Sequence, residues 1–363
     1  MQGAFIGICQ TKMSTNIGII IIIDMEIDFV VTWVDSNDPK WQEEFQKYKG
    51  ITTTADQSKA RYRDWDFFKY WFRSIEKYAP WVHKVYVITN GTFPSWINRD
   101  CQKLVLVKHS DYIPQQYLPT FNSRTIEFYM NSIPGLSEHF VYFNDDMYLN
   151  APVSQEYYFK NGLPCDNNAE TVYNMTAYNP STRFHISVGL FVNVCVINGH
   201  FDRRKVIKQS RKNWYGMHLS LIDRVMSFII SRYHQGWFVG FRRRHIEQPY
   251  LKSVFDEAWE KEAGMLTESS TRFREDATLT PYFFRYWQFA SNKFYPVRLK
   301  EGRKILIIPE KVTNILECLK DKRIKSLCLN DTQKCSDEDY DIIKPILVKA
   351  FEEKYPNKSI FEK

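Results

Sequence analysis

Cysteine is scarce and scattered in this sequence. There are seven cysteines, an odd number, and none forms a CxxC pair, so the sequence supports neither a zinc site nor a disulfide framework. Such a pattern is typical of thiols that pack as small core residues in a reducing compartment. It predicts a cytoplasmic protein.

Long apolar runs are also missing. The most apolar stretch, residues 19–23, ends at Asp24, whereas a membrane-spanning helix needs about 20 apolar residues. No signal-peptide cleavage pattern follows it. Because a strong strand pattern begins just after Met25, we interpret residues 1–24 as an upstream extension, or as the product of a start codon assigned too early.

The excess of positive charge is small. The chain has 49 Lys and Arg against 42 Asp and Glu, a net charge of +7. Dispersed basic residues, without a recognised nucleic-acid module, argue against nucleic acid as a partner. A mild positive charge fits a phosphate-bearing substrate and an attraction to the anionic inner face of a membrane.

Aromatic side chains, in contrast, are abundant. They make up 16% of the 363 residues, within an otherwise ordinary globular composition of 44% hydrophobic and 25% charged residues. The length suits about two domains, or one large α/β domain with insertions. The aromatic residues have two interpretations: they fill a core, or some of them form platforms on which sugars stack.

The first half of the chain alternates between strand and helix patterns. Apolar, β-branched runs predict strands at 27–34, 84–89, 103–108 and 139–143, and helical spacing predicts helices at 40–48, 64–78 and 122–132. This alternation indicates an α/β, Rossmann-like fold with a mainly parallel sheet. Ligands bind beyond the carboxyl ends of such strands, where Asp35, Asn90 and Asp145 lie.

The second half is predicted to be largely helical. Helical patterns occupy 214–232, 250–262, 279–290 and 336–355. Residues 184–198 favour strands around Gly189, and residues 305–308 favour a short strand.

The triplet Asn144-Asp145-Asp146 directly follows a predicted buried strand. Carboxylates at this position commonly hold Mg²⁺ or Mn²⁺, which in turn binds a diphosphate. The alternative is an acidic turn that caps the next segment. Asp35, after the first strand, has the same two alternatives, a ligand carboxylate or a helix cap.

Several side chains suit phosphate chemistry. Arg63, Asp64 and Arg73 cluster around the second helix, where an Arg either clamps a phosphate or pairs with nearby acids. His245 follows three arginines, which disfavour its imidazolium form and favour a neutral base. Arg274 lies in a charged cluster before a helix, where it neutralises a phosphate or belongs to a helix cap.

These segments together resemble a known family. IDFVVTWVDSNDPKW, RYRDWDFFKYWFRSIEKYAPWVHKVYVITNGTFPSWI and LPTFNSRTIEFYMNSIPGLSEHFVYFNDDMYL are similar to the first two signature regions of the Stealth family. RRRHIEQPYLKSVFDEAW and STRFREDATLTPYFFRYW are similar to its third region, and SLCLND to its fourth. The four regions occur in order and span most of residues 27–331.

The resemblance implies a GT-A-like fold and a hexose-1-phosphate transferase of bacterial capsular or cell-surface polysaccharide synthesis. The hydroxyl of an oligosaccharide or polysaccharide acceptor attacks the β-phosphorus of a UDP-sugar, and UMP leaves. An ordinary metal-dependent glycosyltransferase, which releases UDP, is the alternative. A carbohydrate-binding protein that retains the fold is a non-enzymatic alternative.

Carried over by position, the resemblance also implies roles for individual residues. The implied catalytic residues are Asp146, His245 (as the general base) and Arg274. The implied ligands of Mg²⁺ or Mn²⁺ are Asp145, Asp146 and Asp331, next to Asn330. The implied substrate-binding residues are Asp35, Arg63, Asp64, Arg73 and Asn144.

The resemblance also suggests a division of the chain. Residues 25–160 form the nucleotide-sugar-binding core, residues 161–335 complete the catalytic domain with a helical insertion, and residues 336–363 form a C-terminal helix. The sequence departs from the family pattern in two places. Ser36 replaces the usual Gly of the first region, and bulky residues follow Asp64 in DWDFFKYWF. Both lie near predicted substrate-binding residues and bear on which hexose or acceptor is used.

Overall fold

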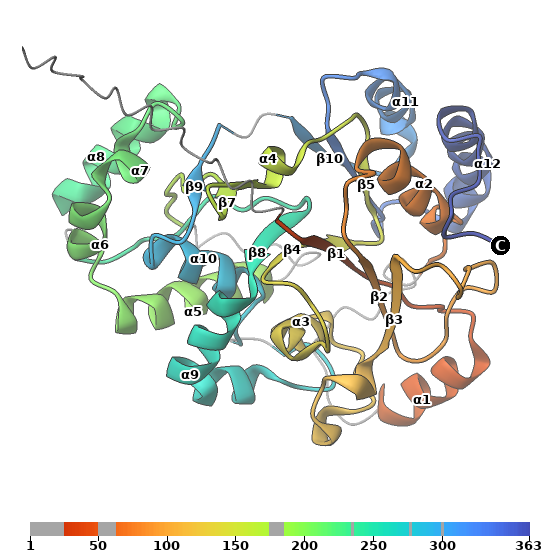
Figure 1. The fold of residues 1–363 in the computed structure, drawn as a ribbon, viewed down its shortest axis with the longest axis horizontal. Coiled ribbons are helices and arrows are strands. Elements are labelled where there is room, and N and C mark those ends of the chain that lie inside the picture. Colours follow the sequence, from red (N-terminus) through yellow and green to blue (C-terminus); the bar gives the residue numbers. More distant parts are fainter. Residues whose placement is uncertain (1–24, 50–62, 174–184, 234–235, 276–277, 299–300) are drawn as a thin grey trace, which may run out of the picture.

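A five-stranded sheet forms the centre of the protein (Figure 1). The computed structural model describes residues 25–49, 63–173, 185–233, 236–275, 278–298 and 301–363, so the predicted extension at residues 1–24 lies outside the described part. The strand order is β3-β2-β1-β4-β8. The strands are β1 (Ile27–Thr32), β2 (Val85–Thr89), β3 (Leu104–Lys108), β4 (His139–Asn144) and β8 (Gln248–Leu251).

The first four strands of this sheet are parallel, and β8 runs antiparallel to β4. Val31 of β1 lies between Val87 of β2 and Phe143 of β4, which places this largely buried strand in the middle of the sheet. The order β3-β2-β1-β4 is that of a Rossmann-like sheet. It confirms the predicted mainly parallel α/β fold and brings the carboxyl ends of β1, β2 and β4 to one edge.

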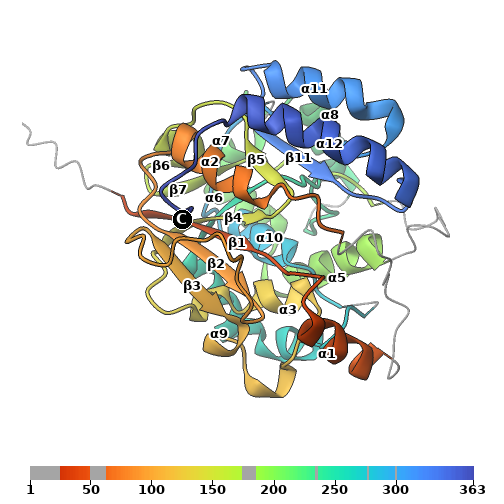
Figure 2. The ribbon, with the colours of Figure 1, turned by 90° about the vertical axis from the view of Figure 1, so that its right-hand side faces the viewer.

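Helices lie on both sides of the sheet (Figure 2). On one side are α2 (Phe68–Tyr78), α11 (Val312–Lys320) and α12 (Asp337–Lys354). On the other side are α3 (Ser123–Phe128) and α9 (Lys252–Ser269), and α10 (Tyr282–Ala290) packs against α9. The short helix α1 (Pro39–Lys49) follows β1.

Two smaller sheets complete the core. The first joins β10 (Gly302–Leu306), β11 (Ser326–Asn330) and β5 (Met147–Leu149), with β11 antiparallel to β5. The second joins β6 (Phe159–Lys160), β7 (Leu163–Asp166) and β9 (Tyr295–Pro296), next to α4 (Gln155–Tyr158). Because β5 follows β4 after a short turn, its pairing with β11 returns a late part of the chain to the end of the main sheet.

A group of helices extends the molecule on the side away from α11 and α12 (Figure 1). It contains α5 (His185–His200), α6 (Arg203–Gln209), α7 (Arg211–Tyr215) and α8 (Leu221–Tyr233). These helices confirm the predicted helical character of the second half. Within the described ranges, none of the helices combines the length and hydropathy needed to cross a membrane.

The prediction of strands around Gly189 is wrong, because this segment is helix α5. Its β-branched residues favour a strand locally, but Leu190, Val194 and Ile197 are buried with helical spacing. Gly189 lies so close to the segment before α10 that a Cβ atom would be 2.6 Å from Thr280 Cγ2 and 2.9 Å from the Thr278 carbonyl oxygen. The glycine therefore allows this segment to pack closely on α5.

The single helix predicted at 214–232 is also corrected. It is divided into α7 and α8, and at Gly216 a Cβ atom would be 2.5 Å from the Lys212 carbonyl oxygen. The helix predicted from residue 250 begins only after β8. In the second case the pairing of β8 with β4 overrides a local helical pattern.

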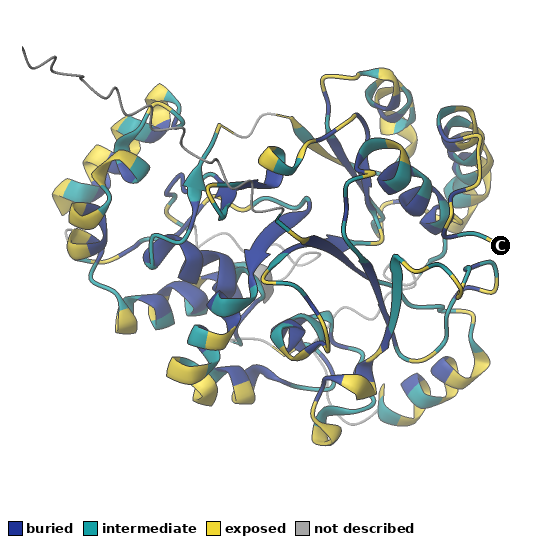
Figure 3. Ribbon diagram, in the orientation of Figure 1, coloured by how far each residue is buried: buried dark blue, intermediate teal, exposed yellow. Residues whose placement is uncertain are grey.

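One continuous hydrophobic core runs from Ile27 to Phe361 and crosses the predicted divisions of the chain (Figure 3). Much of it is aromatic, and Trp71, Trp214 and Trp287 are fully buried. Helix α10 alone buries five aromatic residues. The core interpretation therefore accounts for many of the aromatic residues of the chain.

Candidate active site

The acidic triplet forms the connection between β4 and β5. Asn144 is the last residue of β4, and Asp145 and Asp146 lead into β5. Because β5 pairs with β11, the backbone N–H of Leu329 donates to the carbonyl oxygen of Asp146 at 2.8 Å. The sheet thus fixes Asp146 beside the end of β11.

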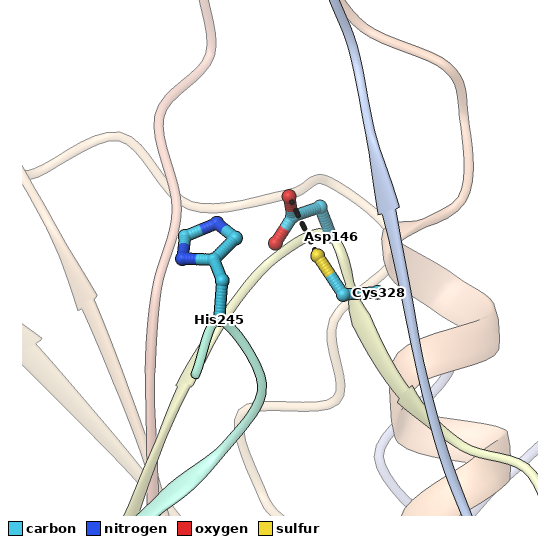
Figure 4. Close-up of side chains that lie close together, drawn as sticks. All are labelled: Asp146, His245 and Cys328. Atoms are coloured by element: carbon cyan, nitrogen blue, oxygen red, sulfur yellow. Dashed lines mark hydrogen bonds between the residues drawn. The ribbon is translucent and has the colours of Figure 1, made fainter. Parts of the chain in front are cut away.

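Three side chains converge on the carboxylate of Asp146, and Figure 4 shows two of them, His245 and Cys328. Asn330 Nδ2 donates to Asp146 Oδ2 at 3.1 Å, and Cys328 Sγ lies 3.4 Å from the same oxygen. His245 reaches the site from the segment that precedes β8. One ligand atom each from Asp146, His245 and Cys328 lies within 4.8 Å of the other two.

These three residues form a possible site for a divalent cation. Asp146 Oδ1 is buried and has no hydrogen-bond partner among the described residues. A buried carboxylate oxygen without a donor is costly, and a cation would satisfy it. The oxygen, nitrogen and sulfur donors of this set suit a transition-metal ion, and the side-chain oxygens of Asp145 and Asn330 nearby are of the kind that Mg²⁺ prefers.

Burial lowers the pKa of His245, although the negative charge of Asp146 opposes this change. The positive charges of Lys304 and Arg243 lower the pKa of His245 further. Lys304 on β10 lies opposite Cys328 in the β10–β11 register. The residue is exposed as a whole, but desolvation of its ammonium group lowers its own pKa. His245 is therefore neutral near pH 7 and suited to accept a proton.

A second group of carboxylates surrounds Asp145. Asp145 as a whole residue is exposed, but its carboxylate is poorly solvated, and this burial together with the charges of Asp146 and Asp64 raises its pKa to about 7. Burial also raises the pKa of Asp64, and Asp35 adds to this effect. The fold thus concentrates negative charge at the ends of β1 and β4, which favours a cation there.

Asn144 belongs to a hydrogen-bond network at the same edge. Its Oδ1 accepts from Tyr142 Oη at 2.8 Å, and Tyr142 Oη lies 3.1 Å from Thr32 Oγ1 at the end of β1. Glu127 of α3 bonds to the same tyrosine, and burial raises the pKa of Glu127 to about 8. Glu127 therefore holds its proton to a higher pH than an ordinary glutamate does.

Arg63 and Asp331 lie together beside the cluster. Asp331 Oδ2 accepts from Trp65 Nε1 at 3.0 Å and lies 3.7 Å from Arg63 Nε. Arg63 also pairs with Asp337 at 3.3 Å, at the start of α12. Asp331 is thus bonded to Trp65 and Arg63 and does not join Asp146, His245 and Cys328.

Asp64 and Asp35 both shape turns in place of capping helices. Asp64 Oδ1 accepts from the backbone N–H of Asp66 at 2.7 Å, and Asp35 Oδ1 accepts from that of Asn37 at 2.9 Å. The helix predicted from residue 64 begins only at Phe68, and its N-cap is Phe67, so Asp64 lies in the turn before it. Asp64 lies close enough to Asp145 for its charge to act there, which keeps it at the site.

Two predicted phosphate-binding arginines lie elsewhere. Arg73 Nε and Nη2 donate to both carboxylate oxygens of Glu362, at 2.9 Å and 2.7 Å, and Nη1 donates to the Tyr355 carbonyl. Arg73 therefore ties α2 to the C-terminal segment, as the ion-pair alternative predicted. Arg274 donates to Ser123 Oγ at the start of α3, and no contact within the described ranges joins it to Asp146 or His245.

Sequence reasoning missed Cys328, Lys304 and Glu127. Cys328 lies inside the SLCLND segment, but its position next to Asp146 follows only from the pairing of β5 with β11. Lys304 depends in the same way on the pairing of β10 with β11. Glu127 follows the Asn122 cap of α3 by five residues, and its place in the NSRTIE segment was the only local signal.

Two family descriptions match the first half of the chain. Stealth protein CR1, conserved region 1, matches residues 25–53, and Stealth protein CR2, conserved region 2, matches residues 61–166. The second match contains the acidic triplet. Among solved structures, the galactosyltransferase LgtC in complex with donor and acceptor sugar analogs is similar in fold. The alignment covers 90% of this chain and 95% of the LgtC chain. The identity is 8% and the TM-score is 0.38.

Curated relatives are similar along nearly the whole chain. The capsular polysaccharide phosphotransferase WcwK of Streptococcus pneumoniae is 38% identical over 348 residues, which cover 93% of this chain and 98% of that protein. The receptor polysaccharide phosphotransferase WefC of Streptococcus oralis is 37% identical over 93% of this chain and 99% of that protein. The exopolysaccharide phosphotransferase cps2G of Lactiplantibacillus plantarum is 35% identical over 93% of this chain and 96% of that protein.

Proposed function

This chain belongs to the Stealth family of polysaccharide phosphotransferases, and from that premise we propose that it transfers hexose 1-phosphate from a UDP-sugar to a sugar hydroxyl. The product is a phosphodiester in a capsular or cell-surface polysaccharide, and UMP is released. The observation that carries the proposal is the convergence of Asp146, His245 and Asn330 from three distant parts of the chain.

In the proposed reaction, an acceptor hydroxyl oxygen forms a bond to the β-phosphorus of the donor. The bond from that phosphorus to the oxygen bridging to the α-phosphate breaks, and the electron pair leaves with UMP. His245 accepts the hydroxyl proton, since its lowered pKa keeps the ring neutral. Arg243 and Lys304, whose charges act on His245, supply positive charge for the donor phosphates.

We propose Mg²⁺ or Mn²⁺ as the cofactor, held by Asp146 with oxygen ligands from Asp145 and Asn330. A bound divalent ion would neutralise the diphosphate and polarise its oxygens. Asp35, Asp64 and Asn144, at the ends of β1 and β4, bind the nucleotide sugar in this proposal. Arg63 and Asp331 lie beside this site, near the start of α12. Arg274 bonds to Ser123 at the start of α3, and its role at the transferring phosphoryl group stays a prediction from the family resemblance.

We also propose that residues 25–160 bind the donor, that residues 161–335 complete the site and that residues 336–363 brace it. The proposed location is the cytoplasm, at the inner face of the membrane. The net charge of +7 supports an attraction to an anionic surface.

The test of the reaction is the identity of the released nucleotide. The purified chain is incubated with UDP-GlcNAc or UDP-Gal, Mg²⁺ and an oligosaccharide acceptor, and nucleotides are separated by ion-exchange chromatography. Release of UMP that depends on acceptor and stops in EDTA is expected. Release of UDP alone would instead identify an ordinary glycosyltransferase.

A matched pair of histidine variants sharpens this test. His245→Ala is expected to abolish UMP release while the protein stays folded. His83→Ala is the control, because His83 bonds to Asp28 before β2, at the opposite end of the parallel strands. Near-normal UMP release by His245→Ala would remove His245 from the mechanism.

A further inference from the structure

Helix α8 presents its apolar residues to solvent. Its buried positions are Asp223, Ser227 and Ile230, of which two are polar. Leu221, Ile222 and Phe228 are 69%, 73% and 71% exposed. A surface helix of a soluble protein normally buries its apolar stripe and exposes its polar residues, so the orientation of α8 is reversed.

Polar contacts hold α8 in this orientation. Asp223 accepts hydrogen bonds from Arg242 and from Ser220 Oγ, the latter at 2.7 Å. Ser231 Oγ accepts from Arg203, which is buried and pairs with Glu170 at 2.6 Å. These bonds restrict the rotation of α8 about its axis. The fold itself therefore keeps the apolar side chains of α8 exposed.

The exposed apolar side chains form one surface, which we name the α8 face. Near the start of α8, Met217 is 75% exposed and lies 3.3 Å from Arg224, and at its end Tyr233 is 78% exposed. Figure 3 shows α8 on the side of the molecule away from α11 and α12, with much of its surface exposed. The α8 face comprises Met217, Leu221, Ile222, Val225, Phe228, Ile229 and Tyr233.

The positive charge of the chain is concentrated in the same segment. Residues 202–233 contain eight Lys or Arg and two Asp, a net charge of +6 out of +7 for the whole chain. The excess of basic residues is therefore concentrated in one segment, which corrects the interpretation that they are dispersed along the chain. Arg203 is buried in its ion pair, and the other seven are exposed or half-buried: Arg204, Lys205, Lys208, Arg211, Lys212, Arg224 and Arg232.

We propose that the α8 face binds an anionic lipid membrane, with α8 lying parallel to the surface. An exposed apolar stripe flanked by Lys and Arg, with a Tyr at its end, is the pattern of an interfacial helix. The 13 residues of α8 extend about 20 Å, too short to span a bilayer but long enough to lie in the interface.

This inference deepens the proposed location without depending on the reaction. Arg242, which binds Asp223 of α8, lies three residues before His245. Attachment through α8 would therefore set the distance of the active site from the membrane.

The experiment is co-sedimentation of the full chain with lipid vesicles. Vesicles of phosphatidylcholine alone are compared with vesicles that contain phosphatidylglycerol in equal parts. Binding to the anionic vesicles is expected, with weaker binding at high salt. The double variant Leu221→Asp/Phe228→Asp should weaken binding by at least about tenfold. Replacing Arg211 or Lys212 by Gln should weaken it by about fivefold each.

Ile342→Asp is the matched control, because Ile342 is 66% exposed on α12, far from α8. Its lipid binding should equal that of the unmodified chain, and circular dichroism should confirm that all variants are folded. The inference is overturned if the unmodified chain does not co-sediment with anionic vesicles. It is also overturned if Ile342→Asp weakens vesicle binding as much as the α8 variants do.

A second copy of the chain is the competing occupant of the α8 face. Sedimentation velocity would reveal it as a dimer that the α8 variants dissociate, without lipid binding, and this result too would overturn the inference. UMP release measured without lipid tests the reaction separately, so the two proposals fail independently.

Discussion

Asp146→Asn should separate catalysis from stability. Asp146 Oδ2 accepts hydrogen bonds from Asn330 Nδ2 and Cys328 Sγ. Asp146 Oδ1 is buried and has no hydrogen-bond partner among the described residues. An Asn side chain can place its oxygen toward Asn330 and its NH₂ group where Oδ1 was. One unpartnered polar atom replaces another, and a negative charge beside Asp145 is lost. The free energy of unfolding should change by no more than about 1 kcal/mol.

The effect of Asp146→Asn on the reaction should be much larger. The variant removes the charge that the cation site offers, while the neutral amide keeps the shape of the site. Loss of one preorganised electrostatic contact typically lowers the rate by about 10²–10³-fold, or about 3–4 kcal/mol. The assay is UMP release at several Mn²⁺ concentrations, together with thermal unfolding with and without Mn²⁺.

Asp341→Asn is the control for this substitution, since Asp341 is exposed on α12. It should leave both UMP release and the Mn²⁺-dependent rise in Tm unchanged. The reasoning would be refuted if Asp146→Asn kept near-normal UMP release and the same rise in Tm with Mn²⁺.

Three further predictions follow from the site and its surroundings. The kcat/KM for UMP release should fall on an acid limb centred below about pH 6.5, because burial lowers the pKa of His245, and a pH profile checks this. Cys328→Ser, with an oxygen in place of sulfur, should weaken Zn²⁺ binding, measured by calorimetry, more than Mn²⁺ binding. Arg73→Ala should cost about 3 kcal/mol in urea unfolding at neutral pH, because it leaves Glu362 buried without its partner. Burial alone would raise the pKa of Glu362, but Arg73 outweighs it and lowers the pKa, so this stabilisation is present above about pH 4.5 and is lost as the pH falls further.

The four parallel strands of the main sheet could be predicted because they are recognisable locally, whereas β8 was not predicted. The predicted strands at 84–89, 103–108 and 139–143 correspond closely to β2, β3 and β4, since each is a short β-branched or aromatic run between turn residues. Helix α5 could not be predicted in this way. Its β-branched residues match a strand, and the close approach of Gly189 to Thr280 depends on a segment far along the chain.

The residues of the candidate site also differ in whether a local signal could predict them. Asp145 and Asp146 were predictable because a strand end carries its own local signal, and the neutral state of His245 agrees with the arginines beside it. Cys328 and Lys304 could not be predicted to lie at the site. Their positions depend on the pairing of β11 with β5 and with β10. An ion pair of Arg73 was one of two predicted alternatives, but its partner could not be predicted because Glu362 lies at the far end of the sequence.

The pairing of β5 with β11 also has a consequence for biosynthesis. As the chain leaves the ribosome, Asp146 emerges well before Cys328 and Asn330, the side chains that contact its carboxylate. The nascent chain can build most of the main sheet early, yet it cannot assemble these contacts until translation has passed β11. A nascent chain that already carries Asp146 and His245 therefore lacks the side chains that hold the Asp146 carboxylate until β11 is made.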